Sequence, residues 1–477
     1  MTAPIDSIPA ARLSRAAYSA RTGLAQKAAP VRIVHLGLGA FHRAHQAWFT
    51  DQVDHAAEWG IAAFTGRNPQ AALELQPQDG LFTLVERSEA GDSASIVTSI
   101  VEAVDGADLA RLLELLAAPS TSIVTLTITE AGYRLNPDGL PNLADPAVAA
   151  DVDWLRAAFA AAALPAVDGT GPTSTLGRLL LGLEARRRAE AGPIAIVPCD
   201  NIPDNGAFLA RGLGALAELT GTALADWIAA EVSFVTTSVD RITPRTTPAD
   251  LAAAAALTGW QDDAAVVTEP FTDWVLSGAF PAGRPAWEQA GARFVDDIEP
   301  FERRKLWMLN GAHSLLAYSG LIRGHETVAQ AMADPICRGW VNAWWDGVVR
   351  HLPAEGLELD EYRAALLKRF DNARIEHRLG QISGEAVTKL RVRMVPTVLA
   401  ERADGRSPDA GIRAIGSWVA LVLRGYPLVD GEAAAVAAAL TAGRDGALER
   451  LVELIDPRLV ADDTVLAGIR AVVTESD

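Results

Sequence analysis

Three polar side chains in one apolar segment have the residue types and the spacing to do acid–base chemistry. Residues 299–319 carry leucines at helical intervals, and Lys305, Asn310 and His313 form a separate polar set within the same segment. At about 100° per residue, Asn310 lies roughly 140° and His313 roughly 80° from Lys305 around the helix axis. We therefore expect the three side chains to share one side of a helix and to converge on one small molecule.

Lysine is rare in this chain, which draws attention to Lys305. Lysine and arginine together number 42, yet lysine occurs only at positions 27, 305, 368 and 389. Arginine cannot give up its proton in a protein, whereas a partly buried lysine can have its pKa lowered towards neutrality and act as a base. Lys305 is thus a candidate general base. The alternative is a surface lysine beside a helix-capping asparagine and a core histidine.

The overall composition excludes several classes of protein. With 477 residues, 49% of them hydrophobic, the chain is long enough for two domains. A net charge of -18 argues against non-specific binding to nucleic acid or to anionic membranes. The N-terminal stretch lacks the apolar core of a signal peptide, and no apolar run reaches the ~18 residues of a spanning helix. We expect a cytoplasmic protein with neither a nucleic-acid nor a membrane partner.

Metal chemistry finds little support in the sequence. The only two cysteines, Cys199 and Cys337, are too few for a disulfide framework or a thiolate zinc cage. His42 and His45 are close in the chain, but no HExxH motif or cysteine pair accompanies them. We therefore expect no metal ligands.

A glycine turn follows the first strong strand signal. Residues 31–36 (VRIVHL) read as a buried strand and run directly into Gly37-Leu38-Gly39, where a helix follows. Strand, glycine turn and helix form the opening of a dinucleotide fold, in which the backbone approaches a pyrophosphate at the helix N-terminus. The usual third small residue is replaced by His42. The alternative is a tight turn of any α/β protein.

The segment after the second expected strand bears on the choice of cofactor. Residues 61–65 form that strand, and it ends at Gly66-Arg67. Enzymes that prefer NAD usually carry Asp or Glu here to accept the ribose hydroxyls, and this chain carries neither. Arg67 is able to pair with a 2′-phosphate, which leaves NADP(H) open beside NAD(H). The alternative is a solvated loop arginine.

Alternating strands and helices predict an α/β fold with a mostly parallel, doubly wound sheet in the first part of the chain. Beyond a connecting region at 245–297 the strand signal fades, so the second part should be mainly α-helical. We expect a dinucleotide-binding domain at 1–296 and a helical substrate domain at 297–477. Further strands are expected at 95–101, 122–129, 193–198 and 232–239, and helices at 106–118, 171–191, 299–319, 326–351, 359–371, 409–424, 431–442 and 445–455.

Polar residues stand where the expected strands end, which is the edge where ligands bind in such sheets. Thr129 and Glu130 follow one strand and Asn201 follows another, where it suits a ligand-facing donor or a turn. Asp204 fits better as a helix N-cap. Asp240 ends a third strand, and it forms with the next residue an Asp–Arg pair that is equally compatible with a structural role.

One basic stretch stands out in the helical half. Arg374 and His377 are three residues apart and would be neighbours on a helix face, and Lys389 follows twelve residues later. Such side chains are able to hold hydroxyls or a carboxylate. The alternative is a solvated basic face.

Five motifs in chain order resemble the polyol-specific long-chain dehydrogenase/reductase family, which includes mannitol 2-dehydrogenase, fructuronate and tagaturonate reductases and D-arabinitol dehydrogenase. They are GLGAFHRAHQ (37–46), TLTITEAGY (125–133), VPCDNIPDNG (197–206), SVDRITP (238–244) and KLWMLNGAHS (305–314). The resemblance implies a zinc-independent, NAD-linked oxidoreductase with a Rossmann-type domain followed by a helical one. It also explains His42, because the family's phosphate loop is similar to GxGxFHRAH.

The resemblance also implies roles for single residues. The family's Lys-x4-Asn-x2-His pattern falls on Lys305, Asn310 and His313, and its second oxyanion asparagine falls on Asn201. Substrate-holding residues similar to Arg374, His377 and Lys389 follow, although the family's Gly-Ser-x-Lys-Leu run survives only at its end in residues 385–390. The expected cofactor-binding residues are Gly37, Gly39, Ala40, Phe41, His42, Arg43, Arg67, Thr129, Glu130 and Asp240.

The leading functional hypothesis is an NAD-dependent dehydrogenase that interconverts D-mannitol, or a related hexitol or pentitol, and its 2-ketose. A fructuronate or tagaturonate reductase, acting on a keto-uronate, is the alternative within the same family. A third hypothesis is a nucleotide-binding protein that has lost catalysis. All four expected catalytic residues are present in the chain, which argues against this hypothesis. The family resemblance favours a monomer.

Overall fold

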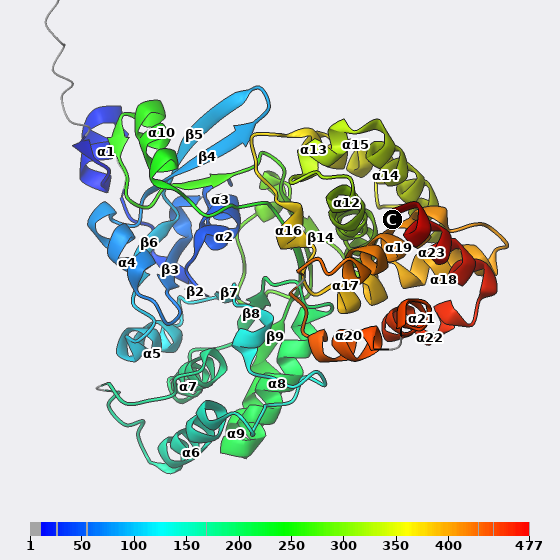
Figure 1. The fold of residues 1–477 in the computed structure, drawn as a ribbon. Coiled ribbons are helices and arrows are strands. Elements are labelled where there is room, and N and C mark those ends of the chain that lie inside the picture. Colours follow the sequence, from blue (N-terminus) through cyan, green and yellow to red (C-terminus); the bar gives the residue numbers. More distant parts are fainter. Residues whose placement is uncertain are drawn as a thin grey trace, which may run out of the picture. The chain divides into compact units, whose positions relative to one another are not determined.

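A computed structural model describes residues 11–24, 27–53, 56–167, 169–427, 429–441 and 443–476. The first ten residues, part of the stretch that argued against a signal peptide, lie outside the described residues. The chain divides into two units, the first ending at Ile298 and the second beginning at Glu299. In Figure 1 the first unit runs from blue to green and the second from yellow-green to red.

A parallel sheet of six strands forms the centre of the first unit, with the order β6-β3-β2-β7-β8-β9. This order runs outward from β2 in one direction and from β7 in the other, which is the arrangement of a doubly wound dinucleotide fold. The strands are β2 (Val31–Leu36), β3 (Gly60–Phe64), β6 (Ile100–Val104), β7 (Ile123–Leu126), β8 (Ile194–Pro198) and β9 (Val232–Phe234).

The strands are apolar on both faces because helices or other strands cover both. One face packs against α5 to α9, and the other packs around Phe49, Trp274 and Trp287. Figure 1 shows α5, α6, α7, α8 and α9 gathered on one side of β2, β7 and β8. The helices of this unit are α1 (Arg15–Thr22), α2 (Ala40–His42), α3 (Trp48–Asp51), α4 (Gln70–Leu75), α5 (Leu109–Ala117), α6 (Pro146–Ala160), α7 (Thr175–Arg188), α8 (Asn205–Thr220), α9 (Thr222–Glu231) and α10 (Pro248–Thr258).

Among the described residues, eight further strands lie outside the main sheet, and two of the predicted strands are divided. The strand expected at 95–101 is divided, because the N–H and hydroxyl of Thr98 both donate to Asp51 Oδ1. The strand expected at 232–239 is also divided between two sheets, and the region at 245–297 is largely structured. The strands are β1 (Ala11–Arg12), β4 (Phe82–Ser88), β5 (Gly91–Val97), β10 (Thr236–Asp240), β11 (Trp260–Gln261), β12 (Val266–Thr268), β13 (Asp273–Ser277) and β14 (Arg293–Phe294).

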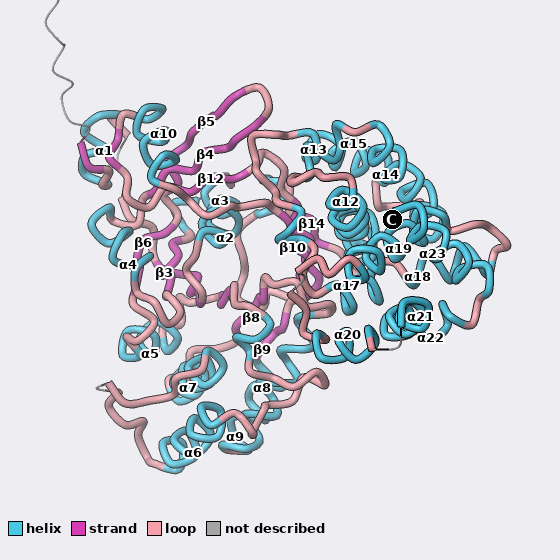
Figure 2. Tube along the Cα trace, in the orientation of Figure 1, coloured by secondary structure: helices cyan, strands magenta, loops and turns pink. Residues whose placement is uncertain are grey.

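The regular elements in the described residues of the second unit are helices, which Figure 2 shows in cyan, and loops join them. The helix predicted at 326–351 is interrupted, since Asp334 caps a new helix whose first residue is Pro335. The elements are α11 (Glu299–Arg304), the π-helical η6 (Lys305–Asn310), α12 (Gly311–Ile322), α13 (Val328–Ala333), α14 (Pro335–Val348), α15 (Leu359–Asp371), α16 (Leu379–Ile382), α17 (Ala386–Arg393), α18 (Val395–Ala403), α19 (Asp409–Leu423), α20 (Ala433–Leu440), α21 (Gly443–Ile455), α22 (Pro457–Val460) and α23 (Asp463–Ser476).

Helix α12 is the central element of this unit. Its residues from Gly311 to Gly320 are all buried, and it packs against α13, α14, α16, α17 and α19. A helix that is buried on every side is fixed by its surroundings, so the polar residues at its start are held firmly. Within the described residues, no helix combines the length and the apolar character needed to cross a bilayer.

Candidate active site

A cavity of about 730 Å³ opens at the carboxyl edge of the main sheet, where the strand order reverses between β2 and β7. The two strands end in register, with Leu36 opposite Leu126, so the loops that follow them face each other. Gly37, Arg67, Thr127 and Thr129 are among the residues that line the cavity. In open α/β sheets this is the place where ligands bind.

The two glycines of the turn differ in backbone conformation and in the space available for a side chain. Gly37 has a φ of +113°, and a Cβ added to it would lie 2.3 Å from the carbonyl oxygen of Thr127. Gly39 has an extended backbone, and the nearest atom to an added Cβ would be the Gly37 oxygen at 3.6 Å. The fold therefore requires glycine at position 37, whereas at position 39 it leaves room beside the backbone.

A buried histidine supports the turn from below. The ring of His35 lies between the hydroxyl of Thr125 in β7 and the hydroxyl of Thr127, which follows β7. Its Nδ1 is 2.8 Å from Thr125 Oγ1 and its Nε2 is 3.0 Å from Thr127 Oγ1. Thr127 in turn donates to the Gly37 carbonyl at 2.9 Å. Burial lowers the pKa of His35 to about 3. The uncharged ring therefore fixes β7 and the glycine turn to each other.

His42 and Arg43 lie beneath the turn and do not line the cavity. The His42 ring stacks on His35 with centroids 3.3 Å apart, and both rings are fully buried. Arg43 donates to the carbonyls of Gly39 and Ala264, and burial lowers its pKa to about 10. These two side chains hold the turn in shape, a role that the glycine motif alone did not predict.

Of the other residues expected to bind the cofactor, some line the cavity and others do not. Arg67 and Thr129 are exposed and line the cavity, and Glu130 is exposed at the start of the next turn. Ala40 and Phe41 are half-buried on α2. Asp240, by contrast, is buried at the end of β10 in a separate three-stranded sheet.

The loop after β8 is built around Asp200. The buried carboxylate accepts hydrogen bonds from the Tyr133 hydroxyl at 2.5 Å and from the Ile202 N–H at 2.9 Å. Burial, and then Asp200, raise the pKa of Tyr133 well above its usual value. Asn201 is exposed on this fixed loop, while Asp204 stands at the N-cap position of α8 without making a side-chain capping bond.

In the second unit, the segment with the predicted catalytic residues is not a regular α-helix. Lys305 to Asn310 form a π-helical turn, in which the N–H of Gly311 donates to the Leu306 carbonyl five residues earlier. In a π-turn the N–H of residue i+5 bonds to the carbonyl of residue i, so each residue turns the chain by less than the roughly 100° of an α-helix. Asn310 therefore lies at a smaller angle from Lys305 around the helix axis than the roughly 140° predicted for an α-helix. Such π-turns occur frequently at functional sites.

Side chains from other helices satisfy the carbonyls of the π-turn. The indole N–H groups of Trp344 and Trp345 donate to the carbonyls of Trp307 and Met308 at 2.8 and 2.9 Å. Gly311 allows the close approach, because an added Cβ would lie 2.7 Å from Trp344 Nε1. The π-turn is therefore a consequence of tertiary packing.

Asn310 and His313 lie three residues apart, and each has a side-chain polar group without a hydrogen-bond partner among the described residues. The Asn310 carboxamide makes no hydrogen bond with any residue that the structure describes. His313 is buried, and its Nε2 has no hydrogen-bond partner within the described part of the chain. Lys305 is half-buried at the start of the turn. Unpaired polar atoms this close together are suited to binding a polar ligand.

The ring of His313 is surrounded by basic groups. It meets the His377 ring edge to face, with centroids 4.7 Å apart, and packs on Phe370. Burial is the main reason that the pKa of His313 lies well below its usual value, and four basic side chains lower it further. They are His377, Arg369, Arg393 and Lys389.

The prediction that Arg374 and His377 share a helix face is wrong. Helix α15 ends at Asp371, and the Asn372 side chain accepts a hydrogen bond from the Arg374 N–H at 3.2 Å, which turns the chain out of the helix. His377 nevertheless reaches His313 from this loop. The structure thus brings His377 and Lys389 to the same group of side chains as His313.

Arg393 also belongs to this group, although the sequence motifs did not predict it. Its guanidinium donates to the Asn310 carbonyl at 3.2 Å and to Ser314 Oγ at 3.1 Å. Burial lowers its pKa to about 10, and no carboxylate among the described residues forms an ion pair with it. Its place four residues after Lys389, on the same face of α17, was the available signal.

The fold and the cavity define a doubly wound dinucleotide-binding protein. The second unit adds an amine and a carboxamide on the π-turn η6 and an imidazole on the buried helix α12 that follows it. Residues 31–289 match the mannitol dehydrogenase Rossmann domain, and residues 297–430 match the mannitol dehydrogenase C-terminal domain. The strand order and the helical second unit agree with both.

Individual relatives agree with this assignment. A mannitol 2-dehydrogenase of Aspergillus terreus is 37% identical over 378 residues, which cover 77% of this chain and 73% of the relative. The D-mannonate oxidoreductase of Escherichia coli is 35% identical over 401 residues, which cover 81% and 79%. The solved Pseudomonas fluorescens mannitol 2-dehydrogenase, a ternary complex with NAD and D-mannitol, has a TM-score of 0.77 and 31% identity over 98% of this chain and 96% of that one.

The chain therefore belongs to the mannitol dehydrogenase family and is an oxidoreductase. The resemblance inferred from the five motifs is confirmed, as is the predicted fold class of a Rossmann-type domain followed by a helical one.

Proposed function

We propose that this protein is a nicotinamide-dependent dehydrogenase that interconverts a secondary alcohol of a polyol and the corresponding 2-ketose, with Lys305 as the acid–base group. The observation that carries the proposal is the pair of unpartnered polar groups, the Asn310 carboxamide and His313 Nε2, beside the π-turn that begins at Lys305. The relatives named as mannitol 2-dehydrogenases support the reaction class.

The residues divide the chemical work as follows. A bound nicotinamide ring supplies the hydride acceptor in oxidation and the donor in reduction. Lys305 removes the hydroxyl proton as the hydride leaves, and it returns the proton in the reverse direction. Asn310 donates a hydrogen bond to the oxygen as negative charge develops on it. His313, kept neutral by burial, orients a neighbouring hydroxyl.

Asn201 is proposed as the second donor to the same oxygen. Asn310→Ala should lower kcat by about 100-fold or more with little change in KM. If both carboxamides hold one oxygen, the double variant with Asn201→Ala should lose less activity than the two single losses combined.

The cavity at the glycine turn is proposed to hold the cofactor. Gly37, Gly39, Arg67 and Thr129 would bind it, with the pyrophosphate lying against the backbone at Gly39, where the fold leaves room. The solved relative with bound NAD supports NAD(H). The absence of an acidic residue after β3, together with Arg67 in the cavity, keeps NADP(H) as the alternative.

A specific observation favours a second candidate substrate class, the hexuronates. The charges of Arg369, Lys389 and Arg393 each lower the pKa of His313, and Arg393 has no carboxylate partner among the described residues. A carboxylate on the substrate would supply the missing negative charge. The relative named D-mannonate oxidoreductase is consistent with this candidate.

One panel of rate measurements separates these candidates. Steady-state kcat/KM would be measured for mannitol, arabinitol, fructose and fructuronate, each with NAD(H) and with NADP(H). The polyol hypothesis predicts the highest values for mannitol and fructose, whereas the alternative predicts fructuronate. NADH binding without turnover of any of the four would contradict catalysis and support a nucleotide-binding protein. That the protein is a monomer and that it is cytoplasmic both stay predictions. Light scattering would check the oligomeric state.

A further inference from the structure

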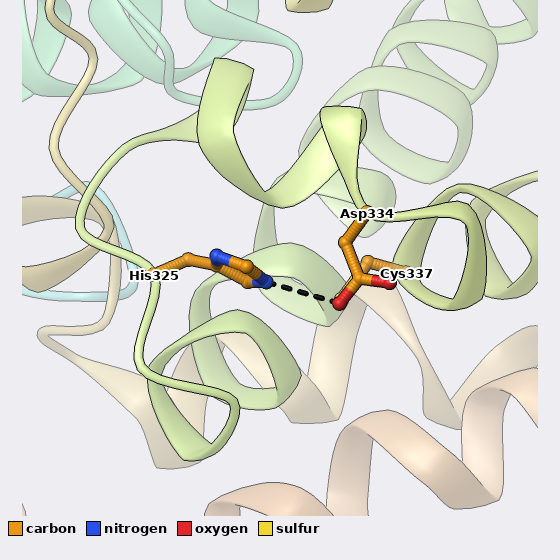
Figure 3. Close-up of side chains that lie close together, drawn as sticks. All are labelled: His325, Asp334 and Cys337. Atoms are coloured by element: carbon orange, nitrogen blue, oxygen red, sulfur yellow. Dashed lines mark hydrogen bonds and ion pairs between the residues drawn. The ribbon is translucent and has the colours of Figure 1, made fainter.

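A second group of chemically active side chains lies at the start of α14, apart from the proposed catalytic and cofactor residues. His325, Asp334 and Cys337 each present one potential metal-ligating atom, and the three atoms lie within 4.8 Å of one another. Asp334 Oδ2 is 3.0 Å from His325 Nε2 and 3.8 Å from Cys337 Sγ. Figure 3 shows the His325 ring directed from its loop towards the carboxylate.

We propose that these three side chains form a binding site for Zn²⁺, with His325 Nε2, Asp334 Oδ2 and Cys337 Sγ as protein ligands and water as the fourth. Zinc in proteins takes this mixture of imidazole, carboxylate and thiolate in tetrahedral geometry. A tetrahedron with bonds of about 2.0–2.3 Å places its ligand atoms about 3.3–3.8 Å apart. The two separations from Asp334 Oδ2, 3.0 and 3.8 Å, are close to that arrangement before any metal is bound, and the His325 and Cys337 ligand atoms lie within 4.8 Å of each other.

The backbone holds all three ligands in place. Asp334 is the N-cap of α14, where its Oδ1 accepts the Ile336 N–H at 2.9 Å, and Cys337 follows three residues later on the same face. The N–H of His325 donates to the Gly320 carbonyl at 2.9 Å, which ties the loop to the end of α12. Little ordering of the chain is therefore needed to complete the site.

The donor set selects the kind of metal. A thiolate and an imidazole favour zinc and neighbouring transition metals, whereas magnesium and calcium prefer a shell of oxygen ligands. On binding, the S–H bond of Cys337 breaks, its proton leaves to solvent, and the metal–sulfur bond forms in its place. No redox partner is required, because Zn²⁺ keeps its oxidation state.

In the metal-free protein Arg323 binds the Asp334 carboxylate, so it would compete with a metal ion for this ligand. Its Nε donates to Asp334 Oδ2 at 2.5 Å, so the carboxylate already has a cationic partner. The arginine side chain is 34% exposed, which leaves it free to swing into solvent when a metal arrives. Removing the arginine should therefore tighten metal binding, an effect opposite to that expected if the cluster is only an ion-pair network.

The cluster also adjoins a segment of the proposed substrate site. Thr327 forms a β-bridge with Arg378, and the Val328 N–H donates to the His377 carbonyl at 3.0 Å. A metal bound through His325 would anchor this pair of segments, so Zn²⁺ should raise the unfolding temperature by preferential binding to the folded chain.

The test uses the full-length protein, stripped with a chelator and titrated with Co²⁺ as a spectroscopic stand-in for zinc. We expect one Co²⁺ per chain, a near-ultraviolet thiolate-to-cobalt absorption band, and displacement of the band by Zn²⁺. The band should disappear in Cys337→Ser and persist in Cys199→Ser, which alters the chain's other cysteine, itself buried. Circular dichroism of the metal-free variants checks that they fold.

Two further variants decide between a metal site and an ion-pair network. His325→Ala should weaken Zn²⁺ binding, measured against a competing chromophoric chelator, by at least the roughly 10–100-fold seen for outer-shell partners. Arg323→Gln should tighten it by roughly 10–100-fold, the effect of losing one hydrogen bond to a charged group. An unchanged band in Cys337→Ser, no stoichiometric binding by the wild type, or weaker binding in Arg323→Gln would each overturn the proposal.

Discussion

Arg393 donates a hydrogen bond to the backbone carbonyl of Asn310 over 3.2 Å, at the last residue of the π-turn. A π-turn changes which backbone carbonyls accept hydrogen bonds within the helix. In this turn the side chains of three residues from other helices donate hydrogen bonds to its carbonyls. Two of them are Trp344 and Trp345, and Arg393 is the third. Arg393 thus fixes the backbone from which the proposed oxyanion donor projects, while adding positive charge beside His313.

Replacing Arg393 by Met should separate its two effects. Loss of the anchor at Asn310 should lower kcat by about 10–100-fold for every substrate, because one hydrogen bond from a charged group contributes about 1.5–3 kcal/mol. Loss of the charge should raise KM only for a substrate with a carboxylate. Lys368→Met, an exposed position on α15, is the control. An unchanged kcat for both mannitol and fructuronate would contradict the anchoring role.

Alanine substitutions at the two glycines of the turn should have opposite consequences. Gly37→Ala should cost about 1–3 kcal/mol of unfolding free energy or more, because its φ of +113° and the Thr127 carbonyl exclude a Cβ. Gly39→Ala should change stability by less than about 0.5 kcal/mol but weaken NADH binding, since the added methyl group would occupy the space proposed for the pyrophosphate. Urea unfolding and NADH fluorescence titration measure the two effects. A Gly39→Ala variant with wild-type affinity would remove the pyrophosphate from this place.

Arg67 should control the preference between the two cofactors. Arg67→Glu introduces a carboxylate able to accept the ribose hydroxyls of NAD and repels a 2′-phosphate. We expect kcat/KM with NADP to fall by about 10–100-fold relative to NAD, the size of one lost charge-assisted hydrogen bond. The ratio of kcat/KM values for NAD and NADP is the measurement. An unaltered ratio would mean that Arg67, although it lines the cavity, does not contact the adenosine ribose.

Lys389 should make the binding of an acidic substrate depend on pH. Burial first, and then Arg393, lower the pKa of this lysine to about 8, while Glu385 and Asp430 act in the opposite direction. The ammonium is therefore charged below about pH 8 and neutral above it. The KM for fructuronate should rise by up to tenfold per pH unit above about 8, and Lys389→Arg should abolish the rise. A KM that is flat from pH 7 to 9.5 in the wild type would exclude Lys389 as a carboxylate ligand.

The lowered pKa of Lys389 also makes the free energy of unfolding depend on pH, and stability should increase as the pH rises above about 8. The folded-state pKa of Lys389 lies below its ordinary value of 10.5, so the unfolded chain binds this proton more tightly. The resulting destabilisation is full below about pH 8 and disappears as the pH rises towards 10.5. Lys389→Met should flatten this part of the dependence of unfolding free energy on pH.

The sequence predicted those features that depend on local pattern. The strand at 31–36 and the glycines after it lie where expected, because a buried strand followed by Gly37 permits few other conformations. The helices at 359–371 and 409–424 also agree with their predicted ranges to within a residue, since their composition is a local feature of the sequence. The separation into a sheet domain and a helical domain followed from the same patterns.

The features that were missed depend on contacts between distant parts of the chain. The π-turn from Lys305 to Asn310 requires donors from Trp344, Trp345 and Arg393, which lie about 35 to 90 residues later, and no local pattern marks them. The loop that carries Arg374 and His377 was mistaken for a helix because a side-chain bond from Asn372 competes with helical bonding. Helical spacing alone is therefore a poor guide to which polar residues of this site meet.

The rate of hydride transfer in Lys305→Ala, followed through NADH absorbance with the best substrate of the panel, shows whether Lys305 is the acid–base group. We expect kcat to fall by about 10²–10⁴-fold, the usual contribution of a general acid–base group, with an unchanged Kd for NADH and partial recovery in the presence of small external amines. Lys368→Ala, at the exposed lysine on α15, should keep the wild-type rate. A Lys305→Ala variant with wild-type kcat would contradict the assignment of Lys305 as the base.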